Sequence, residues 1–104
     1  MGPQNDRDRR IIDVIRALGD GEVATYGEIA DVAGYPRQSR LVGRLLSTSD
    51  DQELPWWRVV NSAGRLVPGH ETEQAALLRA EEVLIGDGKV LSAPVGRFRR
   101  SACP

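Results

Sequence analysis

Two adjacent tryptophans, Trp56 and Trp57, are the most unusual chemical feature of a sequence whose other aromatic residues are two tyrosines and one phenylalanine. Pro55 precedes them, and a hydrophobic, strand-like run follows them. An indole can pack, stack or donate a hydrogen bond, but it offers neither a thiolate nor a base. If the run is extended, the two rings point to opposite faces, so at most one lies in the core. The other ring is then a candidate binding surface.

Three further residues are the candidates for proton transfer or nucleophilic attack: Cys103, His70 and Glu81. Cys103 is the only cysteine and lies one residue from the C-terminus without a positioned base, so we interpret it as a tail thiol. His70, the only histidine, has no second ligand at metal spacing. We interpret it as a loop residue and expect no metal site and no cofactor. Glu81 falls on the apolar face of a predicted helix, where it either reaches solvent or pairs with Arg58.

The length of 104 residues predicts one domain over 1–104, with a core over about 5–95 and a flexible tail over 96–104. Hydrophobic residues make up 40% and charged residues 28%, which is typical of a globular protein. There is no apolar run of membrane-spanning length, and the N-terminal segment is polar and charged, so we expect a cytoplasmic protein without a membrane partner. Net charge is −1, but arginines cluster in 36–46 and 97–100, which favours a local binding face.

The first part of the chain has the pattern of two short helices joined by an extended link. Apolar residues spaced i, i+3, i+4 and i+7 predict a first helix over 5–18, and the link follows over 22–27. Thr25 is a candidate N-cap for the second helix, because Glu28 stands at the capping-box spacing. Gly34 ends that helix.

The third predicted helix, Arg37–Ser47, has two chemically different faces. Apolar side chains fill an arc of about 140°, while Arg37, Arg40 and Arg44 share a separate arc of about 60°. Gly43 costs roughly 1 kcal/mol relative to alanine inside a helix, and such a glycine is tolerated where another backbone approaches closely. Two helices joined by a glycine-containing turn form the helix-turn-helix pattern of DNA-binding proteins. A solvated helix face can also carry three arginines, so the pattern alone leaves both interpretations open.

The C-terminal half predicts a hairpin, a helix and a short strand. Residues 58–61 and 65–67 flank a turn, which predicts a β-hairpin placed like a wing after the helix-turn-helix. The last helix is predicted over 72–85 and a strand over 90–95. The predicted fold is therefore mainly α with a small β-hairpin, a winged helix-turn-helix-like DNA-binding domain.

Three groups of residues occur in a fixed order along the chain. They are Val23-Ala24-Thr25-Tyr26-Gly27-Glu28-Ile29-Ala30; then Gly34, Pro36 and Ser39-Arg40-Leu41-Val42-Gly43; then Leu54-Pro55-Trp56-Trp57-Arg58-Val59-Val60-Asn61-Ser62-Ala63-Gly64. Over about residues 10–86 they resemble the C-terminal DNA-binding domain of the O6-alkylguanine-DNA alkyltransferases. The resemblance implies a domain of the alkyltransferase family that contacts DNA.

In that family the third motif reads Pro-Cys-His-Arg-Val, where the cysteine accepts the alkyl group and the histidine helps to ionise it. Trp56 and Trp57 stand at those two positions, and Glu81 matches the glutamate of the enzymes' relay. Tryptophan in place of the cysteine marks the alkyltransferase-like proteins, which bind the lesion without repairing it. Trp57 departs from many of these, which keep the histidine or place a polar residue there. The resemblance therefore implies a protein that is not an enzyme.

The resemblance also implies roles for individual residues. Tyr26 would press on the 3′ phosphate to rotate the damaged guanine out of the duplex through the minor groove, and Arg40 would fill the gap in the stack. Val59 would offer its carbonyl to the base. The implied lesion pocket comprises Tyr26, Trp56, Val59, Asn61 and Ser62, and the implied DNA-binding residues are Tyr26, Arg37, Ser39, Arg40, Gly43 and Arg44.

The implied partners are double-stranded DNA containing O6-alkylguanine and the proteins of nucleotide excision repair, and we expect a monomer. Three other hypotheses remain open from the sequence. The chain could be a winged helix-turn-helix regulator that reads a specific site. It could be a residual alkyltransferase that uses Cys103, or a protein-interaction module anchored by an exposed tryptophan.

Overall fold

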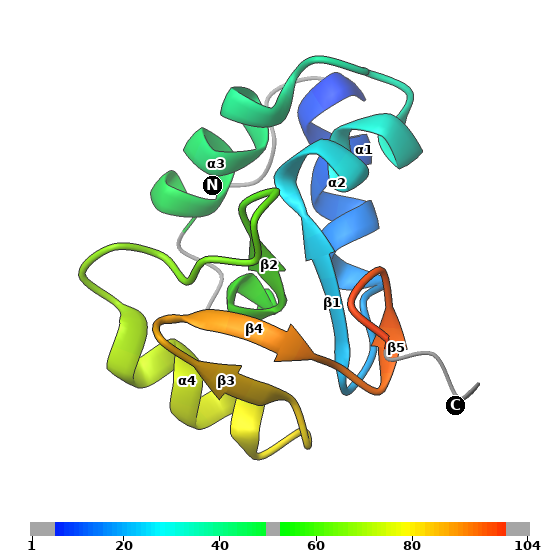
Figure 1. Cartoon of the computed structure of the whole chain (residues 1–104). Helices are drawn as coiled ribbons and strands as arrows, with labels where there is room; N and C mark the ends of the chain where they lie inside the picture. The colour runs from blue at the N-terminus through cyan, green and yellow to red at the C-terminus, as the bar shows by residue number, and fades with distance from the viewer. Residues whose placement is uncertain (1–5, 50–52, 100–104) are drawn as a thin grey trace.

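The structure is a computed structural model that describes residues 6–49 and 53–99. Its helices are α1 (Asp6–Arg16), α2 (Tyr26–Ala33), α3 (Ser39–Thr48) and α4 (Glu71–Arg79), with a 3₁₀ turn over Trp56–Arg58. Its strands are β1 (Glu22–Thr25), β2 (Val59–Val60), β3 (Leu84–Gly86), β4 (Lys89–Ser92) and β5 (Val95–Gly96). Helices α1, α2 and α3 gather at one end, α4 and the β3–β4 hairpin at the other, and β1 runs between them (Figure 1).

The central sheet separates two hydrophobic clusters. Strands β2 and β5 each pair in parallel with β1, which lies between them. Successive residues of a strand point to opposite faces, so Val59 of β2 belongs to one cluster and its neighbour Val60 to the other. Both are fully buried. This short sheet therefore holds the helical end of the molecule to the end that contains α4.

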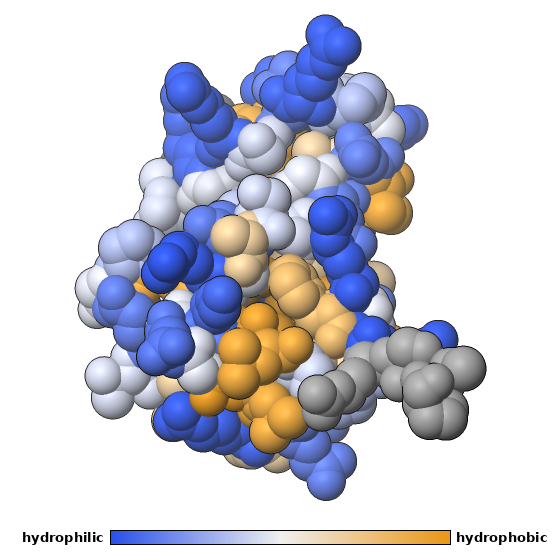
Figure 2. Space-filling model, in the orientation of Figure 1, coloured by the Kyte–Doolittle hydropathy of each residue, from blue (hydrophilic) through white to orange (hydrophobic). Residues whose placement is uncertain are grey.

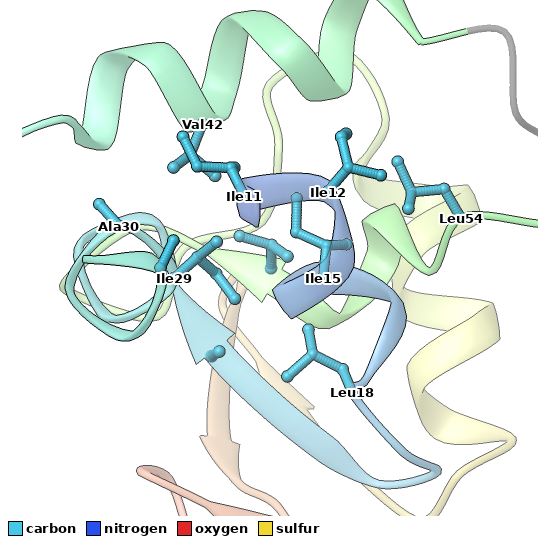
Figure 3. Close-up of a cluster of buried hydrophobic side chains, with 11 residues drawn as sticks. Ile11, Ile12, Ile15, Leu18, Ile29, Ala30, Val42 and Leu54 are labelled. Carbon is cyan, nitrogen blue, oxygen red and sulfur yellow. The ribbon is translucent and has the colours of Figure 1, made fainter. Parts of the chain in front are cut away.

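The first cluster lies between α1, α2 and α3 (Figure 3). Ile11 and Ile15 of α1 are fully buried and face Ile29 of α2 and Val42 of α3, with Leu54 closing one side. Burying each such side chain contributes about 1.5–3 kcal/mol. The cluster fixes the crossing of α2 and α3, which makes the two helices a rigid platform.

The helix-turn-helix prediction is confirmed, with a corrected start for its second helix. Thr25 and Glu28 form the predicted capping box at the start of α2, and Gly34 ends the helix with a φ of 94°. Helix α3 begins at Ser39, not at Arg37 as predicted from Pro36. Arg37 has a φ of 70°, in the left-handed region, so it belongs to the turn between the helices.

The predicted hairpin between segments 58–61 and 65–67 is wrong. Strand β2 pairs with β1 instead, with Val59 opposite Ala24. The carboxamide oxygen of Asn61 accepts hydrogen bonds from the amides of Ala63 (3.0 Å) and Arg65 (2.8 Å), which turns the chain away. The small β-hairpin of this fold is formed by β3 and β4.

The run through the two tryptophans is not extended. Residues Trp56–Arg58 form a 3₁₀ turn, in which the Arg58 amide donates to the Pro55 carbonyl at 3.1 Å. The two indole planes stand at 90° with centroids 6.3 Å apart. The rings therefore enter different surroundings through the turn and not through the alternation of a strand.

The predicted last helix, 72–85, is too long. Helix α4 ends at Arg79, and Glu82 adopts a φ of 68° that a continuing helix forbids. Glu81 therefore lies in a turn after the helix. The strand predicted over 90–95 is β4 in its first part.

The structure places residues 96–99 differently from the flexible tail that the sequence predicts. Gly96 pairs with Val23 of β1, and Phe98 packs against the second cluster. Residues 100–104, with Cys103, lie outside the described residues.

Two further observations concern the exposed apolar side chains and the length of the helices. Figure 2 shows apolar side chains over the β3–β4 hairpin, where Leu84 and Leu91 are 54% and 57% exposed. Within the described ranges, no helix is long and apolar enough to cross a membrane.

Candidate nucleic-acid interface

Tyr26 stands where three hollows of the surface meet, because it lines each of them. It is the first residue of α2, directly after the capping Thr25, so the rigid start of the helix fixes its position. Burial raises the pKa of its phenol, so the hydroxyl stays protonated at neutral pH and can donate a hydrogen bond.

The first hollow has a volume of about 350 Å³ and lies between α3, the 3₁₀ turn and the start of α4. Aromatic and apolar groups form most of its wall, with polar groups at Ser47, His70 and Glu73. The lining residues are Tyr26, Gly43, Leu46, Ser47, Trp56, Val67, His70 and Glu73. The volume falls within the range of small-molecule pockets, and the aromatic walls suit a planar ring.

Gly43 keeps the space between α3 and Tyr26 open. A Cβ atom at this position would stand 3.8 Å from Cε1 of Tyr26, an ordinary van der Waals distance. The fold itself therefore tolerates a side chain at Gly43, while two of the hollows would become narrower. This favours a role for the mid-helix glycine in binding over one in packing.

His70 also lines the first hollow, whereas from the sequence it was interpreted only as a loop residue. Its ring centroid lies 5.8 Å from that of Trp56, at an interplanar angle of 67°. It precedes α4 at the N-cap position, where its side chain makes no capping hydrogen bond. Only the nearby Pro68 and Gly69 signalled a turn here, and nothing in the sequence signalled that the turn faces Trp56.

The second and third hollows lie on the other sides of Tyr26. Asn61 and Ser62 line the second, of about 380 Å³, together with Ser39 and Arg97. Arg40, Ser39 and Gly43 line the third, of about 230 Å³. The predicted pocket residues Trp56 and Asn61 thus stand in different hollows, with Tyr26 between them.

Three predicted residues line none of these hollows. Arg37 is exposed in the turn before α3, and Arg44 is exposed on α3 itself. Val59 is fully buried, and its carbonyl oxygen already accepts a hydrogen bond from Nε2 of Gln74 at 3.3 Å. Their roles in DNA binding stay predictions.

Behind the 3₁₀ turn, Glu81 joins a closed hydrogen-bond network. The predicted pair with Arg58 is confirmed: Arg58 Nη2 lies 2.7 Å from Glu81 Oε2 and Arg58 Nε 3.0 Å from Oε1. The Gly21 amide donates to Oε1 at 2.8 Å, and the Trp57 Nε1–H donates to Oε2 at 2.9 Å. Each carboxylate oxygen therefore has at least two donors.

The network holds Glu81 ionised. Burial alone would raise the pKa of the Glu81 carboxyl, but hydrogen bonds from Arg58, the Gly21 amide and Trp57, together with the Arg58 charge, outweigh it and lower the pKa. Arg58 also contacts the Leu18 carbonyl at 2.7 Å, and its guanidinium carbon lies 5.2 Å from the Trp57 ring centroid. The surroundings of Trp57 are therefore those of a structural residue.

Gln74 connects this network to the first hollow and was missed by the sequence analysis. It is fully buried on α4. Its Nε2 donates to the Trp57 carbonyl at 3.0 Å, and its Oε1 accepts from the Val67 amide at 2.7 Å. The Gln74 side chain thus fixes both the 3₁₀ turn and the loop that line the hollow, and only its three-dimensional surroundings could have revealed this.

In this helix-turn-helix, Arg40 of α3 and the aromatic hollow both lie beside Tyr26. This arrangement is typical of a DNA-binding domain with a pocket. The chain belongs to the family described as 6-O-methylguanine DNA methyltransferase, DNA binding domain, whose model matches residues 6–83. This confirms the resemblance and the fold class inferred from the sequence.

Comparisons with individual proteins and solved structures support the same family. The chain is 40% identical over 85 residues to the DNA base-flipping protein of Vibrio parahaemolyticus, covering 78% of this chain and 85% of that protein. The structure of S. pombe Atl1 in complex with damaged DNA containing O6-carboxymethylguanine matches with a TM-score of 0.74 and 29% identity, over 85% of this chain and 89% of that one. The O6-methylguanine methyltransferase of Mycobacterium tuberculosis matches with a TM-score of 0.67 and 30% identity, over 77% and 50% of the two chains.

Within the described residues, no group of three or more histidine, cysteine, aspartate or glutamate residues could hold a metal ion.

Proposed function

We propose that this protein is a non-enzymatic sensor of O6-alkylguanine in DNA, which rotates the damaged base out of the duplex and holds it against Trp56. The observation that carries the proposal is the aromatic hollow beside α3, which Trp56 lines. By the sequence resemblance, Trp56 stands at the position where the related enzymes have their acceptor cysteine. Relatives named base-flipping proteins and a related structure bound to alkylated DNA support it.

The chemistry of the hollow suits an alkylated purine. Stacking of a base on an aromatic side chain is worth about 1–3 kcal/mol, and Tyr26 and Trp56 both stand in the wall. The apolar Leu46 and Val67 can contact the alkyl group. Rotating a base out of the stack costs a few kcal/mol and least at a weakened pair, so contacts to the extruded base decide which guanines stay out.

The helix-turn-helix would bring this hollow to the DNA. Arg40 lines a hollow next to Tyr26, so it can enter the space that the extruded base leaves. Ser39 and Gly43 lie beside it, and Arg37 and Arg44 are exposed at and near α3, where they can bind phosphates. Minor-groove binding of this kind reads little sequence.

The site lacks the groups that alkyl transfer needs. By the sequence resemblance, Trp56 and Trp57 stand where the related enzymes have a thiol and an imidazole, and the Glu81 carboxylate accepts hydrogen bonds on both oxygens. We extend the proposal to a monomer in the cytoplasm that marks the lesion for nucleotide excision repair. The link to nucleotide excision repair rests on the family resemblance.

A paired titration tests the proposal. Two dye-labelled duplexes of identical sequence, one with guanine and one with O6-methylguanine at a single position, are titrated with protein and followed by fluorescence anisotropy. We expect the O6-methylguanine duplex to bind at least tenfold more tightly. Equal affinity for the two duplexes would overturn the proposal, and a strong preference for one base sequence would favour a site-specific regulator instead.

Two variants assign the effect to residues. Trp56→Ala should reduce the preference for O6-methylguanine, because the stacking wall is lost. Arg40→Ala should weaken binding to both duplexes, because no side chain then fills the gap in the stack. Circular dichroism establishes that each variant is folded. Unchanged lesion binding by both variants would contradict the assigned roles.

A further inference from the structure

The C-terminal segment returns to the candidate DNA face although it lies beyond the part of the chain that the family model matches, residues 6–83. Strand β5 pairs with β1, so that Val95 lies opposite Glu22 and Gly96 opposite Val23. Strand β1 leads directly into Tyr26. Arg97, the next residue after β5, thereby comes to line the same hollow as Tyr26 and Ser39.

The backbone around Arg97 is fixed on both sides. Gly96 has a φ of 93°, and a Cβ atom there would stand 2.9 Å from the Val23 carbonyl oxygen, so only glycine allows this close pairing. Phe98 packs against the second cluster, and its carbonyl accepts a hydrogen bond from the Ala93 amide at 3.0 Å. The Arg99 amide donates to the Gly96 carbonyl at 3.0 Å, which closes a turn with Arg97 at its apex.

The side chain of Arg97 is exposed and uncommitted. Among the residues that the structure describes, it has no ion pair and no hydrogen bond. Among the described residues that line this hollow, Arg97 is the only one with a positive charge, whereas Glu28 and Asp31 are acidic. Glu28 Oε1 accepts from the Thr25 amide at 3.0 Å as part of the capping box, while Asp31 is exposed.

The charge of Arg97 determines whether this hollow attracts or repels an anionic partner. Without it, the side of Tyr26 that faces Asn61 and Ser62 would present two carboxylates and would repel a DNA backbone. With it, a guanidinium fork stands beside the hydroxyls of Ser39 and Ser62, a donor set that suits phosphate oxygens.

We propose that Arg97 binds a backbone phosphate of the DNA at the hollow that it lines with Tyr26, Asn61 and Ser62, so that the C-terminal segment forms a third DNA-contacting element besides α3 and the Tyr26 region. This inference rests on the proposed function only for the binding of DNA. The contact is to a phosphate, so it is independent of the base in the pocket.

The test compares the wild type and four variants on the guanine and O6-methylguanine duplexes over a range of salt concentrations. Arg97→Ala removes the cation, and Arg97→Lys keeps the charge without the planar fork. Asp31→Asn removes a carboxylate from the same hollow, and Arg79→Ala, in the last turn of α4 and outside the lining of all three hollows, is the matched control.

We expect Arg97→Ala to reduce the affinity for both duplexes equally, by roughly fivefold to tenfold at low salt. The slope of log K against log salt should become shallower by about 0.9. Arg97→Lys should lose less, and Asp31→Asn should bind several-fold more tightly. Arg79→Ala should match the wild type.

An unchanged affinity and salt slope for Arg97→Ala in a protein of unchanged melting temperature would overturn the inference, as would equal losses for Arg97→Ala and Arg79→Ala. The proposed function fails by a different result, namely equal affinity of the wild type for the two duplexes.

Discussion

Trp56 and Trp57 are neighbours in the chain, yet they lie in regions of opposite character. Trp56 faces a hollow of about 350 Å³, with Tyr26 across it and His70 at its edge. Trp57 donates its N–H to Glu81 and lies against Arg58, in a network whose groups already have partners. The ring of Trp56 lines an open hollow that can receive a ligand, whereas the polar group of Trp57 is already hydrogen-bonded within the protein.

Under the proposed function, this contrast separates the part of the site that binds from the part that carries the reaction in the related enzymes. In the related enzymes, by resemblance, the same two positions hold a nucleophile and the base that activates it. Here the first position has become a pocket wall, and the second has become a donor that satisfies Glu81. The Glu81 carboxylate, which would support proton transfer, instead stabilises the turn that holds Trp56.

The largest expected effect comes from opening the closed network. Glu81→Gln removes the charge that balances Arg58, whose side chain is only 11% exposed. We expect a loss of roughly 2 kcal/mol in the free energy of unfolding. This is less than for an isolated buried pair, because Arg58 Nη2 also contacts Oδ1 of the exposed Asp20 at 2.6 Å. Urea unfolding measures it. Glu82→Gln, one residue further along and exposed, should stay within about 0.5 kcal/mol of the wild type.

The same network predicts a pH dependence. The pKa of Glu81 in the folded state lies below the ordinary value of 4.5, so its contribution to stability is present in full above that pH and is lost as the pH falls through the folded pKa. The difference in free energy of unfolding between wild type and Glu81→Gln should therefore shrink below pH 4.5. A constant difference down to the acid transition would show that the charge of Glu81 is not what stabilises the turn.

A smaller effect, of opposite sign for stability and binding, is expected at the open region. Gly43→Ala should raise the free energy of unfolding by about 0.5–1 kcal/mol, because alanine favours a helix and the new Cβ makes an ordinary contact with Tyr26. The same Cβ narrows the hollows, so affinity for O6-methylguanine DNA should fall several-fold.

Thr48→Ala, on the same helix but outside the hollows, is the control and should leave DNA affinity unchanged. Loss of binding and of stability together in Gly43→Ala would mean that the glycine is required for packing.

The smallest expected effect concerns reactivity, because introducing a thiol at position 56 should not create an alkyltransferase activity. Trp56→Cys restores a thiol to the hollow, but Trp57 supplies no base and Glu81 is held by its donors. The thiol should therefore acquire alkyl groups from O6-methylguanine DNA no faster than a free cysteine, as followed by intact mass. Rapid alkylation would show that the closed network does not limit the chemistry.

The parts of this fold that depend on neighbouring residues could be predicted from the sequence. The capping box of Thr25 and Glu28 and the end of α2 at Gly34 involve groups a few positions apart. The Arg58–Glu81 pair could be anticipated as one of two alternatives, because a carboxylate on an apolar surface needs a partner.

The rest depends on contacts between distant segments. The turn signal at Asn61 was correct, but the strand before it pairs with β1 and not with its own continuation. Gln74 and His70 carry no local signal, since their importance comes from what the fold places against them. Arg97 belonged to a basic patch in the sequence, and only the pairing of β5 with β1 brings it beside Tyr26.

One measurement tests most directly the claim that the site binds the lesion and does not react with it. The protein is mixed with equal amounts of a guanine duplex and an O6-methylguanine duplex of distinguishable mass, and native mass spectrometry records the complexes and then the released protein. We expect a one-to-one complex, predominantly with the O6-methylguanine duplex, and a protein of unchanged mass. Equal occupancy of the two duplexes, or a protein heavier by one methyl group, would contradict the account.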